Sequence, residues 1–302
     1  MKKLLNILLL AASLSECFAQ SHDSLIMRLM PDIPTSITVV SDRADYLAKH
    51  FWDKFDFADT ATMLKDNLLE RYFTEYLDVL NLTSGKETSD IMITLIKKSE
   101  KEPLAFNKLL EIAPRYLYNA ESPFKDEEKL IPVLQYAVGS SLLGEYEQIR
   151  PRFMLDMMLK NRVGEKATDF EYTLVDGEKS SLYSISADYT ILFFKDPHCD
   201  DCRALTKQLI VSPSINGLIG KGSLKILALY TLDDVEAWKK HASEVLHSWI
   251  YAHNADGAIL NDILYDVKHY PTLYLLDKEK KVALKDTSIQ QIEEYLNKVY
   301  GR

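Results

Sequence analysis

The sequence predicts an all-helical N-terminal domain followed by an α/β domain with a central sheet. Before residue 160, apolar residues recur at helical spacing, and only three of the ten glycines lie there. From Gly164 onward, short β-branched and aromatic runs alternate with helical stretches, which is typical of a sheet covered by helices. With 302 residues and 47% hydrophobic content, the chain is long and apolar enough for two domains with separate cores.

The N-terminal domain, residues 20–160, is expected to contain five or six helices joined by short connections. Apolar side chains between residues 64 and 80 make two neighbouring helical rows: Leu64, Leu68, Tyr72 and Tyr76, with Leu69, Phe73, Leu77 and Leu80. We expect Pro114 to end or kink a helix that follows Pro103, and Pro132 to open a helix over 133–143. Four aromatic residues are interpreted as core or interdomain packing rather than as a partner surface: Phe51, Trp52, Phe55 and Phe57.

The C-terminal domain, residues 161–302, is expected to alternate strands with helices. Strands are predicted at 170–175, 189–194, 224–230, 249–252, 272–276 and 282–284. Helices are predicted at 199–210, 233–245 and 288–299. The alternation by itself favours a largely parallel sheet covered on both faces.

Residues 1–19 have the features of a secretory signal peptide. Lys2 and Lys3 precede an apolar run over 4–14 that is too short to span a bilayer, and residues 17–19 place small side chains at the cleavage positions before Gln20. A lipid anchor on Cys17 is the weaker alternative, because Glu16 stands where lipoprotein signals have a small residue. We therefore expect export to the periplasm.

Charge and hydropathy narrow the class of partner. The formal net charge of −9 argues against a nucleic-acid binder, which needs a basic surface. After the signal peptide, no stretch reaches 18 consecutive apolar residues, so no transmembrane segment is expected in the mature chain.

Two cysteines remain after the signal peptide, and they are spaced C-x-x-C. Cys199 and Cys202 follow a predicted buried strand and open a predicted helix, so both thiols should lie on one helix face within disulfide-forming distance. The positive end of the helix dipole favours a thiolate at Cys199, the nucleophile of thiol-disulfide exchange, and Cys202 would then resolve the mixed disulfide. A loop this short stabilises a fold by only about 2 kcal/mol, so a structural staple is a poor explanation.

A second motif, Tyr270-Pro271, lies about seventy residues later. Proline cannot donate to a strand ladder, so Pro271 fits the start of the apolar strand that follows, and a cis bond after Tyr270 would make a tight turn there.

Together, these motifs resemble the thioredoxin-like family, and most closely its exported TlpA/ResA-type branch. Residues 163–167 with Phe170 resemble the entry motif of that branch, and Asp176-Gly177 resembles its first turn. Ahead of this module, Ile33-Pro34 and residues 43–46 and 50–57 resemble a helical domain of unknown function from Gram-negative envelope proteins. The resemblance implies a thioredoxin-like α/β fold, a central mixed sheet flanked by helices, preceded by an all-α domain.

The resemblance also implies a function. A thiol-disulfide oxidoreductase of this kind uses Cys199 to attack and Cys202 to resolve, with Tyr270 and Pro271 guiding the substrate backbone. It needs no cofactor or metal beyond its redox-active disulfide. Its partners would be substrate proteins with disulfides and an upstream membrane or envelope thiol reductase, which places it in cell redox homeostasis.

The residues around the cysteines depart from the family pattern. Asp200 and Asp201 replace the common Gly-Pro and oppose ionisation of Cys199, unless they act only as favourable first-turn residues. Three residues favour ionisation: Lys195, His198 and Arg203. We expect a less acidic thiol than a strong oxidant needs, and therefore a reductant.

Three alternatives remain open from the sequence. The cysteine pair is also compatible with a zinc half-site or an inert local disulfide, although no second ligand pair stands at zinc-binding spacing. The chain is compatible with a binding or scaffold protein whose helical domain recognises a partner and whose thioredoxin-like domain is vestigial. A peroxide-reducing enzyme is the third, but a C-x-x-C pair favours dithiol exchange.

Overall fold

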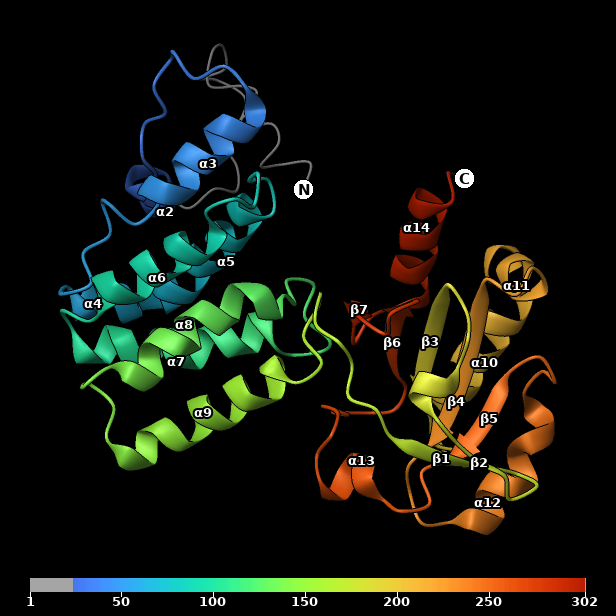
Figure 1. Ribbon diagram of the computed structural model, residues 1–302. Coiled ribbons are helices and arrows are strands. Elements are labelled where there is room, and N and C mark those ends of the chain that lie inside the picture. The colour runs from blue at the N-terminus through green and yellow to red at the C-terminus, as the bar shows by residue number, and fades with distance from the viewer. Residues whose placement is uncertain (1–23, 302) are drawn as a thin grey trace. The chain divides into compact units, whose positions relative to one another are not determined.

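The computed structural model describes residues 24–301, and the chain divides into two compact units between Leu155 and Asp156 (Figure 1). The expected signal peptide, residues 1–19, and the alternative lipid site at Cys17 lie outside the described residues.

The described part of the first unit is entirely helical, as expected, but it contains more helices than the expected five or six. They are α2 (Ser24–Leu29), α3 (Val40–His50), α4 (Thr60–Leu64), the 3-10 helix η1 (Lys65–Asn67), α5 (Leu68–Leu80), α6 (Thr88–Ser99), α7 (Pro103–Leu117), α8 (Glu127–Gly139) and α9 (Glu145–Leu159). The additional elements include α2 and α4, which are too short to show a helical period in the sequence.

Pro114 and Pro132 lie inside helices, as does Pro151 in α9, and the first two positions correct two expectations. Helix α7 continues past Pro114 to Leu117, and the carbonyl of Pro114 still accepts a hydrogen bond from Tyr118 N at 3.0 Å. Helix α8 begins at Glu127, ahead of Pro132, and is capped by Asp126. A proline removes a single ladder bond, and burial of both proline rings and their neighbours offsets that loss here.

The aromatic cluster of the first unit forms its core, as expected. Phe51, Trp52, Phe55 and Phe57 are all buried. The hydroxyl of Tyr72, on α5, donates to the carbonyl of Phe51 at 2.7 Å, and the two rings lie 4.4 Å apart. This contact joins α5 to the end of α3.

The second unit contains a seven-stranded sheet of order β2-β1-β5-β4-β3-β6-β7. Its strands are β1 (Glu171–Leu174), β2 (Lys179–Ser181), β3 (Tyr189–Phe194), β4 (Leu224–Tyr230), β5 (Ile250–His253), β6 (Thr272–Asp277) and β7 (Val282–Lys285). Only the pairs β3–β4 and β4–β5 are parallel, so the sheet is mixed. The mixed sheet implied by the family resemblance is confirmed, and the largely parallel sheet inferred from alternation alone is wrong.

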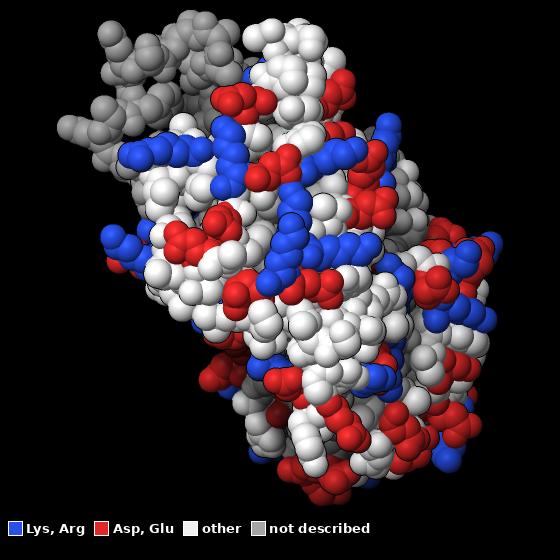
Figure 2. All heavy atoms as spheres, turned by 90° about the vertical axis from the view of Figure 1, so that its left-hand side faces the viewer, with Lys and Arg blue, Asp and Glu red and all other residues white. Residues whose placement is uncertain are grey.

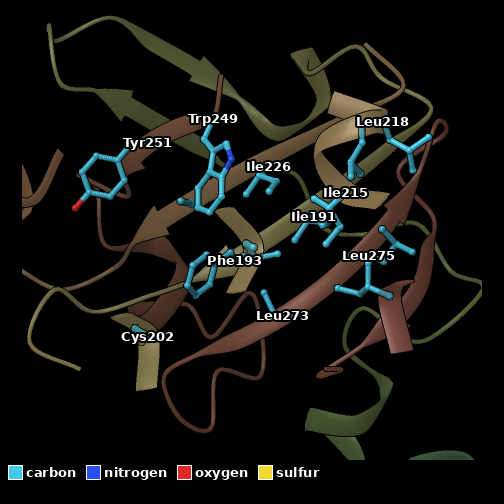
Figure 3. Close-up of a cluster of buried hydrophobic side chains, with 14 of the residues drawn as sticks. Ile191, Phe193, Cys202, Ile215, Leu218, Ile226, Trp249, Tyr251, Leu273 and Leu275 are labelled. Atoms are coloured by element: carbon cyan, nitrogen blue, oxygen red, sulfur yellow. The ribbon is translucent and has the colours of Figure 1, made fainter. Parts of the chain in front are cut away.

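Helices cover both faces of this sheet (Figure 1). They are α10 (Asp200–Val211), α11 (Pro213–Gly220), α12 (Val235–Lys240), the 3-10 helices η2 (Leu182–Ser184) and η3 (His241–Glu244), α13 (Ala258–Asn261) and α14 (Ile289–Val299). Alternate residues of the central strands point into two separate apolar clusters. Cys202 belongs to the cluster under α10, α11 and α14, and Figure 3 shows it at the margin of that cluster.

The charged side chains on the face in Figure 2 are of both signs and lie intermixed. Exposed pairs of this kind contribute little to stability. Among residues 24–301, no helix is both long and apolar enough to cross a bilayer.

Candidate active site

Strand β3 ends at Phe194, and a short turn leads directly into α10. Cys199 is the N-cap residue of this helix, and its Sγ accepts a hydrogen bond from the backbone N–H of Cys202 at 3.0 Å. The turn is closed by Asp196, whose carbonyl accepts from Cys199 N at 3.2 Å. An N-cap sulfur receives both a backbone hydrogen bond and the helix dipole, and both stabilise a thiolate.

The two thiols occupy different environments. Cys199 is partly exposed, whereas Cys202 is fully buried, and both are free cysteines. Burial, followed by the hydrogen bond to Cys199, raises the pKa of the Cys202 thiol to about 12. The outer sulfur is therefore placed to attack, and the inner sulfur is kept protonated.

The raised pKa of Cys202 predicts that the dithiol form loses stability in alkali. Above pH 9, the ordinary pKa of the group, the unfolded chain releases this proton while the folded chain keeps it. The unfolded state then binds fewer protons, so the free energy of unfolding falls as pH rises toward about 12. Urea unfolding of the reduced protein, repeated about every half pH unit between pH 7 and pH 10, measures this fall in the free energy of unfolding. Reduced Cys202→Ala is the control, and an equal pH slope in both proteins contradicts the prediction.

The loop before β6 faces Cys199. The Tyr270–Pro271 bond is cis, as the sequence predicted, and Cys199 Sγ donates to the carbonyl of Tyr270 at 3.4 Å. The Tyr270 side chain turns inward, where its hydroxyl hydrogen-bonds with that of Thr231 at the end of β4. Burial raises the pKa of the Tyr270 phenol. The backbone of Tyr270, rather than its ring, is therefore the part that meets the nucleophile.

A cleft of about 400 Å³ opens beside Pro271, between α10 and the start of α14. Apolar and uncharged polar side chains line most of it: Leu205, Gln208, Leu273, Thr287, Ser288, Ile289 and Gln290, with Glu293. The carboxylate of Glu293 accepts hydrogen bonds from Ser212 and Ser214 and is the charged group among these lining residues.

Of the five residues expected to tune the thiols, Arg203, Asp200 and His198 make polar contacts near the start of α10. Arg203 binds the carbonyl of Pro197 at 3.0 Å and the carboxylate of Asp200. His198 is exposed, with its Nε2 3.8 Å from the carboxylate of Asp234. Asp201 lies exposed in the first turn of α10.

Lys195, the remaining member of that group, lies inside the fold with its side chain 1% exposed. Burial lowers the pKa of its ammonium. The sequence did not predict this burial, nor the roles of Thr231 and Tyr251 around the site. Thr231 directly follows β4, whereas Tyr251 lies within β5, and neither residue belongs to a motif that would have indicated its role. In the described part of the chain, no cluster of three or more His, Cys, Asp or Glu is arranged to hold a metal.

Comparison with solved structures identifies the family to which this fold belongs. The chain is 38% identical to a thioredoxin-like protein from Bacteroides caccae, with a TM-score of 0.85, and the match covers 88% of this chain and 96% of the other. Because this similarity spans nearly all of both proteins, the chain belongs to the family of thioredoxin-like proteins.

Two further structures each match a little under half of the chain. The C-terminal domain of an uncharacterized protein from Bacteroides fragilis is 43% identical, covering 45% of this chain and 98% of that one, with a TM-score of 0.45. The thioredoxin domain of a thiol-disulfide oxidoreductase from Bacteroides vulgatus is 20% identical, covering 45% and 96%, with a TM-score of 0.38.

A family model also matches the helical region. Residues 13–161 match the family described as a domain of unknown function (DUF5106), which confirms the resemblance inferred for the helical region. Comparison with curated proteins gives no significant match.

Proposed function

We propose that this protein is an exported thiol-disulfide oxidoreductase that reduces disulfides in other proteins. One observation carries the proposal: a partly exposed Cys199 caps α10, one turn from a buried Cys202, and faces the carbonyl that precedes cis-Pro271. These positions supply an accessible nucleophile, a protected second thiol and a backbone edge for a substrate.

The reaction proceeds in two exchanges. The thiolate of Cys199 attacks a substrate disulfide, forming a mixed disulfide and releasing one substrate sulfur as a thiolate. Cys202, after losing its proton, attacks Sγ of Cys199, and the second substrate sulfur leaves. The two thiol hydrogens end on the substrate sulfurs, and the two electrons leave the protein as its own disulfide forms.

The high pKa of Cys202 supports the reducing direction. Strong oxidants of this chemistry stabilise their reduced form, usually as a thiolate. Burial of Cys202 opposes that stabilisation. Within this proposal the protein works in the periplasm, where an upstream membrane or envelope thiol reductase restores the dithiol after each turnover, and it needs no cofactor beyond the cysteine pair.

The substrate would enter as an extended, largely uncharged segment. The cleft beside Pro271 starts at the same loop that faces Cys199, and its free lining offers apolar contacts and amide or hydroxyl groups. This shape and polarity suit a stretch of unfolded chain around a disulfide.

The reduction potential of the Cys199–Cys202 pair tests the direction. Equilibration with dithiol buffers followed by thiol alkylation should give a value near or below about −250 mV, in the range of cellular reductants. A value near about −120 mV, that of a strong oxidant, contradicts the reducing role.

Trapping tests the activity itself. In Cys202→Ser, the mixed disulfide at Cys199 cannot be resolved, so envelope proteins should remain attached and be released by added dithiol. Cys199→Ser with Cys202 intact is the matched control and should trap nothing. If neither variant accumulates adducts and the wild-type pair never exchanges, the binding-protein alternative replaces this proposal.

A further inference from the structure

A lysine is buried close to the dithiol in the sequence and in the fold, and aromatic rings rather than polar groups face its ammonium. Lys195 follows β3 directly, and its Nζ lies 5.8 Å from the ring centre of Phe193 and 5.5 Å from that of Tyr251. Its ammonium makes no hydrogen bond or ion pair with any residue between 24 and 301. Burying an ammonium costs desolvation free energy unless other charges or dipoles offset it, so lysine is uncommon at a position of this kind.

The two rings connect Lys195 to the inner cysteine. Phe193, Tyr251 and Cys202 belong to one apolar cluster, and Figure 3 shows all three around the same end of it. Burial raises the pKa of the Cys202 thiol; a backbone hydrogen bond at Asp196 and, to a smaller extent, the charge of Lys195 lower it. In a water-poor cluster, such an interaction is screened far less than at the surface.

We propose that Lys195 stabilises the Cys202 thiolate and thereby sets the rate at which Cys202 releases substrate from the mixed disulfide. This inference rests on the proposed function and assigns Lys195 to its second exchange. Lys195 touches neither substrate nor the bond that breaks. It acts through Cys202 and is a positioning residue.

The charge balance explains why a cation suits this place. Before the second exchange, Cys202 must lose its proton inside an apolar cluster, which burial opposes. When the proton leaves to solvent, the anion on Cys202 and the ammonium of Lys195 offset one another. As the new bond forms between Cys202 Sγ and Cys199 Sγ, the electron pair departs with the substrate sulfur, and the negative charge leaves the cluster.

Other ionisable groups also act on this lysine. From the elements around it, they are Cys199 and Cys202 at the start of α10, Glu244 on η3 and the phenol of Tyr251 on β5. Glu244 opposes the effect of burial on the pKa of the ammonium, as do Cys202 and Cys199. Glu244 therefore helps to keep Lys195 charged.

The experiment separates the two exchanges in the full-length mature protein. The reduced protein is mixed with the aryl disulfide dithiobis(nitrobenzoate) in a stopped-flow instrument, and each released thiolate is followed by absorbance. Attack by Cys199 gives the first release, and attack by Cys202 gives the second. Cys202→Ser, which should show only the first release, assigns the phases.

Lys195→Met removes the charge while keeping the length of the side chain. We expect the first phase to stay within about twofold and the second to slow at least threefold, with its pH profile moved to higher pH. Loss of the charge raises the pKa of the Cys202 thiol further and so lowers its thiolate population, while the greater nucleophilicity of the more basic thiolate recovers part of the lost rate. Lys195→Arg, which retains the charge, should restore most of the second phase.

Lys280→Met is the matched control. Lys280 is the other lysine among the buried polar residues, and its Nζ reaches Thr190 at the opposite end of β3. Its replacement should change neither phase by more than about twofold. If Lys195→Met does not fold, as judged by circular dichroism, Lys195→Gln takes its place against Lys195→Arg.

Three results overturn the inference: an unchanged second phase, equal slowing of both phases, or equal rates for the charged and uncharged variants. A different conclusion follows if the wild-type protein shows the first release of thiolate but never the second. That result defeats the proposed dithiol function, whatever Lys195 does.

Discussion

Replacing Cys199 with serine should reduce the rate of disulfide reduction by about 1,000-fold or more. A serine hydroxyl at this N-cap position still accepts the Cys202 N–H, so the turn into α10 remains capped. It does not ionise at neutral pH, however, and the attacking thiolate is lost. Reduction of insulin disulfides, with dithiothreitol as the electron donor, measures the effect.

The control for this variant lies on the same helix. Val211→Ser changes a side chain that is 72% exposed at the far end of α10, and it should leave the rate within about twofold. Residual activity above one tenth of the wild-type rate in Cys199→Ser would mean that Cys202 is itself accessible. The different roles assigned to the two thiols would then have to be abandoned.

Much of the α/β unit was predictable because its central strands are continuous apolar runs. Strands β3 and β4 begin and end where the sequence predicted. Strand β2 was missed because Lys179–Ser181 is short and polar, and it is held only by pairing with β1. The antiparallel pairing of β1 with β5 depends on contacts between segments far apart in the sequence, and the spacing of apolar residues within each segment does not predict such contacts.

The candidate site also contains residues that could be predicted from the sequence and residues that could not. Cys199, Cys202 and Pro271 were predicted because each combines an uncommon residue with a position at the end of a predicted element. Lys195 was expected to act on Cys199, and its burial under the rings of Phe193 and Tyr251 was not foreseen. Which side chain fills the space behind the dithiol is decided by tertiary packing between β3, β5 and η3, and no local pattern encodes it.

The core of the helical unit gives the largest expected effect on stability. Phe51→Ala should lower the free energy of unfolding by about 3–5 kcal/mol. The ring is fully buried and lies 4.4 Å from the ring of Tyr72 and 5.1 Å from that of Tyr76, so its removal leaves a cavity as well as lost apolar contacts. Urea unfolding followed by far-ultraviolet circular dichroism measures the change.

Tyr146→Ala is the control for that measurement, because this aromatic side chain of the same unit is 86% exposed and its loss should cost less than about 0.5 kcal/mol. The reduction potential of Cys199–Cys202 provides the second comparison. The dithiol rests on the separate cores of the α/β unit, so Phe51→Ala should leave the potential unchanged within about 10 mV, which corresponds to about 0.5 kcal/mol for two electrons. A larger shift would show that the packing of the helical unit is coupled energetically to the redox chemistry, and would make the helical unit a regulator of the dithiol.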